Sequence, residues 1–153
     1  MTTALSRYDA ACHALAEAKD LAEVKGIELV VRAPAARLEV RSDRRALGQI
    51  LINLASNAIK FTDAGEVCLQ LRRDDERGVT VFSVIDTGRG IRVEDQGRLF
   101  AAFEQIVIEN ETGAEGSGLG LSICQTLAAT LGTSVSFVSE YGTGSTFQIE
   151  IGD

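Results

Sequence analysis

The chain has few of the cysteines that cross-link small proteins and few of the histidines and cysteines that bind metals or act in catalysis. It has no tryptophan, one histidine and three cysteines in 153 residues. Cys12, Cys68 and Cys124 are far apart, odd in number and without CxxC spacing, which argues against a disulfide framework or a zinc site. We expect them to act as small apolar residues in a reducing, cytoplasmic compartment. Chemistry that needs a histidine must use His13 or come from another chain.

Positive charge and long apolar runs are also scarce. Lys and Arg number 15 against 22 Asp and Glu, so the net charge is −7. Nucleic-acid binding needs a basic face, which this acidic chain is poorly placed to offer. No apolar run approaches the roughly 20 residues that span a bilayer, and the first residues lack the apolar segment of a secretion signal. We expect a domain that contacts neither nucleic acid nor membrane directly.

What the sequence does contain predicts one α+β domain over residues 1–153. Its length suits a single domain with its own core. Helical and strand patterns mix along the chain, which indicates a two-layer α/β sandwich. The predicted helices are 4–25, 43–61, 93–103 and 119–131, and the predicted strands are 27–33, 66–73, 79–86, 134–139 and 145–151. Residues 34–42 read as a connection with a short extended piece, and 104–118 as a long loop.

The predicted helix 43–61 has a polar face opposite its apolar stripe. Asn53 and Asn57 lie four residues apart and share that face, with Lys60 close to it. Such a face can be solvated surface. It can also form a site with oxygen ligands, because an amide oxygen coordinates Mg²⁺ and leaves room for waters and phosphates.

Three glycine-rich stretches stand at the ends of predicted elements: "DTGRGI" (86–91), "GSGLGLSI" (116–123) and "GTGSTF" (142–147). Each is compatible with a plain turn when taken alone. "GSGLGLSI" lacks the lysine of a phosphate-binding P-loop and does not follow a strand, so neither well-known glycine motif fits. Amides exposed at a helix N-terminus nevertheless bind anions.

Taken in order, these stretches closely resemble the ATP-binding catalytic domain of sensor histidine kinases, in the GHKL ATPase superfamily. "NLASNAIKFT" (53–62) resembles the asparagine box and "LFAAFEQ" (99–105) the phenylalanine box, while the three glycine stretches resemble the three glycine boxes. The resemblance covers roughly residues 9–151. It implies a mixed sheet of about five strands with helices on one face, and ATP bound between the helices and a flexible lid.

The resemblance also implies a role for each residue around the base. Asp86 would accept a hydrogen bond from the exocyclic amine of adenine, and Thr146 would support the base. Phe61 would lie near the adenine pocket. Gly88 and Gly90 would let a flat group approach the backbone.

At the phosphate end, the resemblance makes Asn57 the Mg²⁺ ligand and Asn53 its companion. Lys60 would reach the phosphates, where a cation offsets their charge. Other branches of the superfamily carry a glutamate at the position of Asn53, and an amide cannot act as a general base. The resemblance therefore implies a domain that holds ATP for transfer rather than hydrolysing it well.

The lid is expected at about 104–117, with Phe100 and Phe103 anchoring its near end. Gly116 and Gly118 would act as its hinge, and the first turn of the last helix would offer its amides to the phosphates. Residues 104–117 contain no lysine or arginine, although family lids often carry one. The expected consequence is weaker ATP binding, a contact from Arg98, or a cation from a partner domain. The nucleotide-contacting residues expected in this box are Gly116, Ser117, Gly118, Leu119 and Gly120.

The function implied is transfer of the γ-phosphoryl group of ATP to a histidine on a dimerisation module in two-component signalling, with a response regulator as the indirect partner. His13 has no acidic residue after it and lies in a helix of this domain, so the phosphoacceptor belongs elsewhere. The isolated domain is expected to be a monomer and its parent kinase a homodimer. The alternatives are a nucleotide-binding regulator without transfer activity, which the acidic lid favours, and a serine kinase of the anti-sigma-factor type.

Overall fold

The main element of the fold is a five-stranded sheet with strand order β2-β4-β5-β7-β6. The structure is a computed structural model, and it describes residues 3–6, 16, 18–33, 39–99 and 119–152. The sheet is mixed, because β2 runs parallel to β4 while the other neighbouring pairs are antiparallel. Its strands are β2 (Glu28–Arg32), β4 (Glu66–Asp74), β5 (Val79–Asp86), β6 (Val135–Glu140) and β7 (Gly144–Gly152).

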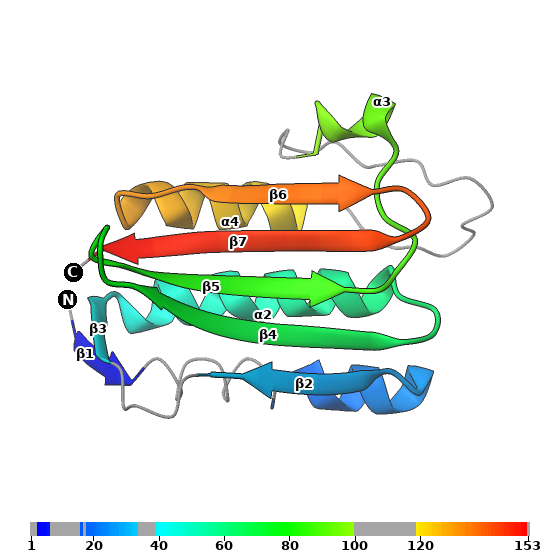
Figure 1. The fold of residues 1–153 in the computed structure, drawn as a ribbon, viewed down its shortest axis with the longest axis horizontal. Coiled ribbons are helices and arrows are strands. Elements are labelled where there is room, and N and C mark those ends of the chain that lie inside the picture. Colours follow the sequence, from blue (N-terminus) through cyan, green and yellow to red (C-terminus); the bar gives the residue numbers. More distant parts are fainter. Residues whose placement is uncertain (1–2, 7–15, 17, 34–38, 100–118, 153) are drawn as a thin grey trace.

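Two long helices cover one face of this sheet. Figure 1 shows α2 (Arg44–Lys60) and α4 (Leu119–Thr130) side by side behind the strands. A helical segment at 18–25 lies beside β2, and the short helix α3 (Val93–Gln96) lies beyond the β6 edge. The predicted α+β two-layer sandwich, with a mixed sheet and helices on one face, is confirmed.

Helix α2 is fixed at both ends by hydrogen bonds that its sequence supplies. The Asp43 carboxylate accepts from the backbone N–H groups of Arg45 at 2.9 Å and Ala46 at 3.1 Å, as an N-cap does. These bonds hold the pKa of Asp43 below its usual value. At the other end, Lys25 Nζ donates to the carbonyl oxygens of Ile59 and Lys60, both at 2.9 Å. The helix therefore presents its last turn to the site in a defined position.

The beginning of the chain departs from the sequence-based expectation. Residues 4–25 were predicted to form one helix, but Thr3–Ser6 forms strand β1. This strand pairs antiparallel with β3 (Glu39–Ser42) in a separate two-stranded sheet, and β3 is the short extended piece predicted within 34–42. Helical residues are described only at 16 and 18–25. Pairing with a distant segment overrides the weak helical preference of the first residues.

The helix predicted over 93–103 is also shorter than expected among the described residues. It ends at Gln96, with Gly97 as its C-cap residue. Glycine in a helix interior is unfavourable by about 1 kcal/mol relative to alanine, which accounts for the early end. Residues 100–103 lie outside the described part of the chain.

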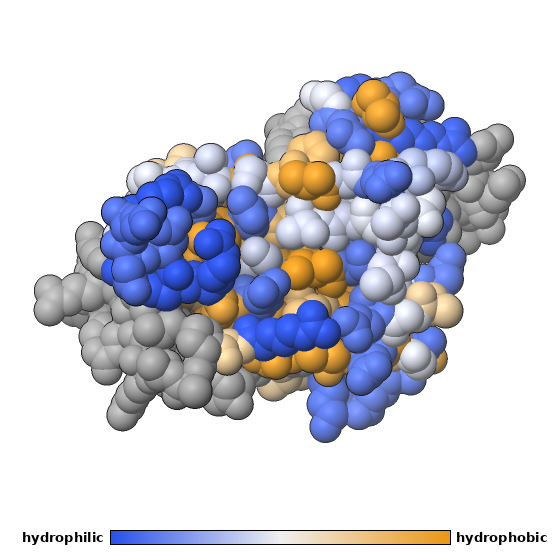
Figure 2. All heavy atoms as spheres, in the orientation of Figure 1, coloured by the Kyte–Doolittle hydropathy of each residue, from blue (hydrophilic) through white to orange (hydrophobic). Residues whose placement is uncertain are grey.

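The core lies between the helices and the inner face of the sheet. Leu47, Ile50 and Leu51 of α2 are completely buried there, against strand residues such as Phe82 and Ile149. Figure 2 shows the opposite face of the sheet as a mixture of apolar and polar residues. The helices of the described residues cover only the inner face, so the site must form along the inner face or at its rim.

Candidate functional site

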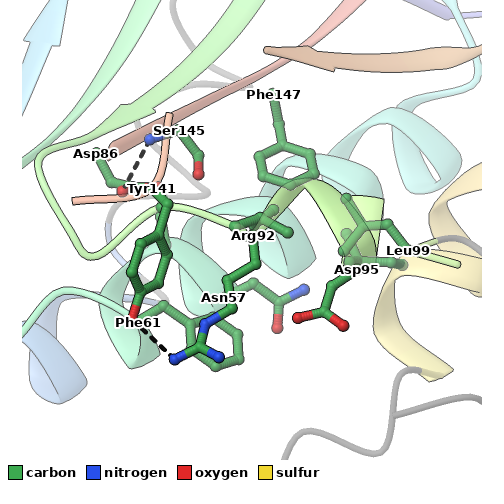
Figure 3. Close-up of a pocket in the computed structure, with 13 residues that line it drawn as sticks. Asn57, Phe61, Asp86, Arg92, Asp95, Leu99, Tyr141, Ser145 and Phe147 are labelled. Atoms are coloured by element: carbon green, nitrogen blue, oxygen red, sulfur yellow. Dashed lines mark hydrogen bonds between the residues drawn. The ribbon is translucent and has the colours of Figure 1, made fainter. Parts of the chain in front are cut away.

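A pocket opens at one end of the inner face of the sheet. Its walls come from the last turns of α2, the loop after β5, α3, the first turns of α4, and the β6–β7 turn with β7 (Figure 3). Segments far apart in the sequence therefore meet around one space. The lining residues are Asn57, Ala58, Phe61, Asp86, Gly90, Ile91, Arg92, Asp95, Leu99, Leu121, Tyr141, Ser145 and Phe147.

Asp86 is the buried acid of this pocket. It ends the largely apolar strand β5 and is only 7% exposed. Its Oδ1 atom accepts backbone N–H groups from Gly88 at 2.9 Å and Ser145 at 3.3 Å (Figure 3). Within the described residues, Oδ2 accepts no hydrogen bond, which leaves it for a donor on a ligand. Burial raises the pKa of Asp86, and the two amide bonds oppose that rise.

Gly88 and Gly90 hold the loop after β5 close to other parts of the backbone. A Cβ atom on Gly88 would collide with the carbonyl oxygen of Phe61. Gly90 has φ +73°, and a Cβ there would collide with the carbonyl oxygen of Glu140. Gly90 lines the pocket, whereas Gly88 does not. The close approach that these glycines permit is an approach of the protein's own chain, which fixes the loop after Asp86 between the end of α2 and the end of β6.

The polar face of α2 reaches the pocket through one of its three predicted residues. Asn57 lines the pocket. Asn53 does not, and its Oδ1 accepts from Gln49 Nε2 at 2.8 Å. Lys60 is exposed and also lies outside the pocket lining. Of these three side chains, only Asn57 lines the pocket in this structure, and the roles of Asn53 and Lys60 toward a ligand stay predictions.

A magnesium ion fits this donor set only with a phosphate ligand present. The described residues contain no cluster of three or more His, Cys, Asp or Glu side chains able to hold a metal alone. Mg²⁺ usually keeps several waters and takes one or two protein ligands plus phosphate oxygens. The amide oxygen of Asn57 at the pocket wall meets that requirement.

Phe61 lies in the pocket wall, as predicted. The guanidinium of Arg89 lies 5.7 Å from its ring centroid, a cation–π distance. Arg89 also approaches Asp63, with 3.5 Å between Nη2 and Oδ1. These contacts hold the ring against the last turn of α2.

Thr146 does not line the pocket, and its neighbours in β7 do. Side chains alternate across a strand, so Ser145 and Phe147 face the pocket while Thr146 lies on the other face. Ser145 pairs directly with Asp86 in the β5–β7 register. The inward alternation of Phe147, Ile149 and Ile151 in β7 was a signal that could have selected Ser145 from the sequence.

Sequence reasoning also missed three charged or polar residues in the wall: Arg92, Asp95 and Tyr141. Arg92 Nη2 donates to the Tyr141 hydroxyl at 3.3 Å, and its guanidinium carbon lies 5.0 Å from the Tyr141 ring centroid (Figure 3). Asp95 is 8% exposed, and its Oδ1 accepts from Arg98 Nη2 at 2.9 Å. These residues follow the first glycine box or precede the third, where no sequence pattern marked a side chain.

Several predicted site residues lie outside the described part of the chain: Phe103, the expected lid at 104–117 with Gly116 and Ser117, and Gly118. Their roles remain predictions. Leu119 and Gly120 form the first residues of α4, and Leu121, the next residue, lines the pocket. The start of this helix is thus placed at the pocket wall.

The family of the chain follows from a profile match over most of its length. The profile described as "Histidine kinase-, DNA gyrase B-, and HSP90-like ATPase" matches residues 42–152. The chain belongs to this ATPase family. The match spans every pocket-lining residue.

Curated relatives of this ATPase domain are much longer histidine kinases and sensor proteins. It is 39% identical over 131 residues to hybrid signal transduction histidine kinase B of Dictyostelium discoideum. It is 40% identical over 136 residues to the autoinducer 2 sensor kinase/phosphatase LuxQ of Vibrio cholerae, and 42% identical over 135 residues to the virulence sensor protein BvgS of Bordetella bronchiseptica. These alignments cover 83%, 87% and 86% of the chain but only 7%, 16% and 11% of the relatives.

Solved structures agree with this assignment. Full-length ShkA in complex with AMPPNP matches 98% of the ATPase domain with a TM-score of 0.85 and 33% identity, over 30% of its own chain. The catalytic domain of histidine kinase ThkA matches 99%, with a TM-score of 0.82 and 23% identity over 97% of its chain, which shows the shared fold. Among the described residues of the domain, no helix has the length and apolar character needed to cross a membrane.

Proposed function

We propose that this ATPase domain binds Mg²⁺-ATP and transfers the γ-phosphoryl group to a histidine on a separate dimerisation module in two-component signalling. The observation that carries the proposal is Asp86, a buried carboxylate with one oxygen turned to no protein donor among the described residues, in an otherwise largely apolar pocket. Family membership and the AMPPNP complex of ShkA support the choice of an adenine nucleotide.

In this proposal the base occupies the end of the pocket at Asp86. Oδ2 accepts a hydrogen bond from the adenine amine, while Gly88 and Ser145 hold Oδ1. Phe61 and Phe147 supply apolar surface for the flat ring. A purine without a donor at this position leaves a buried carboxylate oxygen without a partner, which costs binding energy.

The phosphates extend toward Asn57 and the first turn of α4. The Asn57 amide oxygen would coordinate Mg²⁺, which when bound offsets phosphate charge and aligns the transferring group. Amides at the start of α4 would face the anionic end of the nucleotide. Asn53 is an amide bonded to Gln49, so it provides no base to activate water, and transfer is favoured over hydrolysis.

The acceptor is a histidine outside this domain. Its imidazole nitrogen forms a bond to the γ-phosphorus as the bond from that phosphorus to the β,γ-bridging oxygen breaks. ADP leaves with the electron pair, and the imidazole proton goes to solvent. The protein's part is to position the reactants and to stabilise charge. A dimerisation module and a response regulator as partners, and a cytoplasmic location, belong to the same proposal.

The test combines binding with transfer in trans. Calorimetry should show Mg²⁺-dependent ATP binding, and incubation with γ-labelled ATP and a separate dimerisation module should label a histidine. A histidine phosphoramidate is acid-labile, whereas phosphoserine is acid-stable. Acid-stable label would favour the serine kinase alternative, and intact binding without any label would favour a nucleotide-binding regulator.

A matched pair of variants separates the site from general damage. Asp86→Asn should weaken ATP binding by about a hundredfold or more and reduce labelling accordingly. Thr146→Val, in the neighbouring strand but on the other face of the sheet, should preserve both. Equal loss in the two variants would contradict the placement of the base at Asp86.

A further inference from the structure

The pocket has an unusual shortage of positive charge for a site that takes a triphosphate. Two carboxylates line it, Asp86 and Asp95, against one cationic side chain among the described residues, Arg92. The expected lid at 104–117 contains no lysine or arginine in its sequence. A cation that offsets phosphate charge must therefore come from a small set of residues.

The other basic residues near the pocket are directed elsewhere. Lys60 is exposed and does not line the pocket. Arg98, which was a candidate from the sequence, donates to Asp95 at 2.9 Å and also lies outside the lining. Arg89 lies over the Phe61 ring and close to Asp63.

Arg92 is held at the pocket wall by a residue from a distant segment. It is the N-cap residue of α3, whereas Tyr141 lies in the turn between β6 and β7. The Tyr141 hydroxyl accepts from Nη2 at 3.3 Å and the ring centroid lies 5.0 Å from the guanidinium carbon. Figure 3 shows the Arg92 guanidinium meeting the Tyr141 hydroxyl at the end of that side chain away from Asp86. A hydroxyl and an aromatic ring orient a guanidinium without removing its charge.

We infer that Arg92 is a nucleotide-binding residue that supplies the positive charge for the anionic part of the ligand, and that Tyr141 is the residue that positions it. This inference rests on the proposed function, because it takes the ligand to be an adenine nucleotide. Its claim is narrower: Arg92 distinguishes charged nucleotides from the uncharged nucleoside. An arginine suits this role because its planar fork binds phosphate oxygens in pairs.

The test is calorimetric titration of the domain with Mg²⁺-ATP, ADP, AMP and adenosine. Arg92→Ala should weaken ATP binding about tenfold, the value of one hydrogen bond to a charged group. Adenosine binding should change by less than about twofold, since it carries no phosphate charge. Arg92→Lys keeps the charge and should recover part of the loss. Raising the salt concentration should weaken ATP binding less in Arg92→Ala than in the wild type.

Arg32→Ala is the control, because Arg32 is exposed in β2 and neither it nor its ion-pair partner Glu66 lines the pocket. It should leave ATP affinity near the wild-type value. For Tyr141, the readout is a double-mutant cycle. If Tyr141 acts through Arg92, Tyr141→Ala weakens ATP binding in the wild type and adds little in Arg92→Ala, while Tyr141→Phe, which keeps the ring, has the smaller effect.

Three results would overturn the inference: unchanged ATP affinity in Arg92→Ala, an equal loss for adenosine and ATP, or a larger loss of ATP affinity in the control Arg32→Ala. Fully additive effects of the two alanine variants would overturn the role of Tyr141. Failure of the proposed function looks different: the wild-type domain would then bind none of the four ligands, or would bind nucleotide and label no histidine on the separate module.

Discussion

Replacing Asp86 by asparagine should separate binding from folding in a measurable way. The two side chains have nearly the same shape, so the backbone N–H groups of Gly88 and Ser145 can still donate to an amide oxygen placed at Oδ1. The amide nitrogen then takes the place of Oδ2 and faces the adenine amine, donor against donor. If the amide turns over, its nitrogen faces the two backbone donors instead. Either orientation leaves hydrogen-bond donors without acceptors.

The size of the effect follows from these contacts. Losing a hydrogen bond to a charged acceptor costs about 1.5–3 kcal/mol, and a buried donor without a partner about 1–3 kcal/mol more. Together this is about 2.5–6 kcal/mol, or roughly 10²- to 10⁴-fold in Kd for ATP. A purine nucleoside triphosphate without the amine should bind the wild type weakly and should lose little further in Asp86→Asn.

The folding stability of Asp86→Asn should increase, in contrast to its ATP affinity. Burial raises the pKa of Asp86, so the folded state holds this proton more tightly than the unfolded state. The stability that Asp86 contributes is therefore present below its unfolded pKa and is lost as the pH rises through its folded pKa. Asparagine does not titrate, so Asp86→Asn should gain stability relative to the wild type between acid and neutral pH.

Two measurements on the same samples check the argument: calorimetric titration with Mg²⁺-ATP at neutral pH, and urea unfolding across the acid-to-neutral range. ATP affinity within about threefold of the wild type would refute the role of Asp86 in reading the base. The stability of Asp86→Asn relative to the wild type should be higher at neutral pH than at acid pH. The opposite result would refute the assigned direction of the Asp86 pKa shift.

Three further outcomes follow from the geometry. Gly90→Ala forces a side chain into φ +73° and against the carbonyl of Glu140, so its free energy of unfolding in urea should fall by about 1–3 kcal/mol; an unchanged midpoint would contradict the close approach. Burial raises the pKa of the Cys124 thiol to about 11, so an alkylating reagent at pH 8 should not modify Cys124 until urea is added, as measured by mass spectrometry. Rapid alkylation of Cys124 in the folded protein would contradict this burial. Thr146→Val should keep ATP affinity within about twofold in calorimetry. A larger loss would show that Thr146 contributes to nucleotide binding.

The sequence predicts those parts of the fold where local pattern and packing agree. Helix 43–61 combines a capping acid with an apolar stripe, and α2 begins and ends within a residue of that range. The strands predicted at 66–73 and 79–86 form β4 and β5, which pair antiparallel. At Thr3–Ser6 the pattern fails, because the partner of β1 is β3, more than thirty residues away, and no local signal describes that pairing.

The candidate site also contains residues that the sequence predicts and residues that it does not. Asp86, Asn57 and Phe61 line the pocket as predicted, because each belongs to a motif with a recognisable pattern. Arg92 and Tyr141 meet through contacts between α3 and the β6–β7 turn, so their pairing depends on tertiary structure alone. Ser145 is an intermediate case: strand periodicity was enough to find it, but the motif directed attention to its neighbour.

The carboxylate at the centre of the site is oriented by main-chain amides, and this has a consequence for mutational tolerance. Every residue except proline supplies an N–H group, so position 145 can donate to Asp86 with any small side chain. Position 88 supplies the same kind of bond but leaves no room for a Cβ beside Phe61 and Thr62. In a saturation-mutagenesis map, the two donors to one oxygen atom should therefore differ: position 145 should tolerate several small residues, and position 88 only glycine.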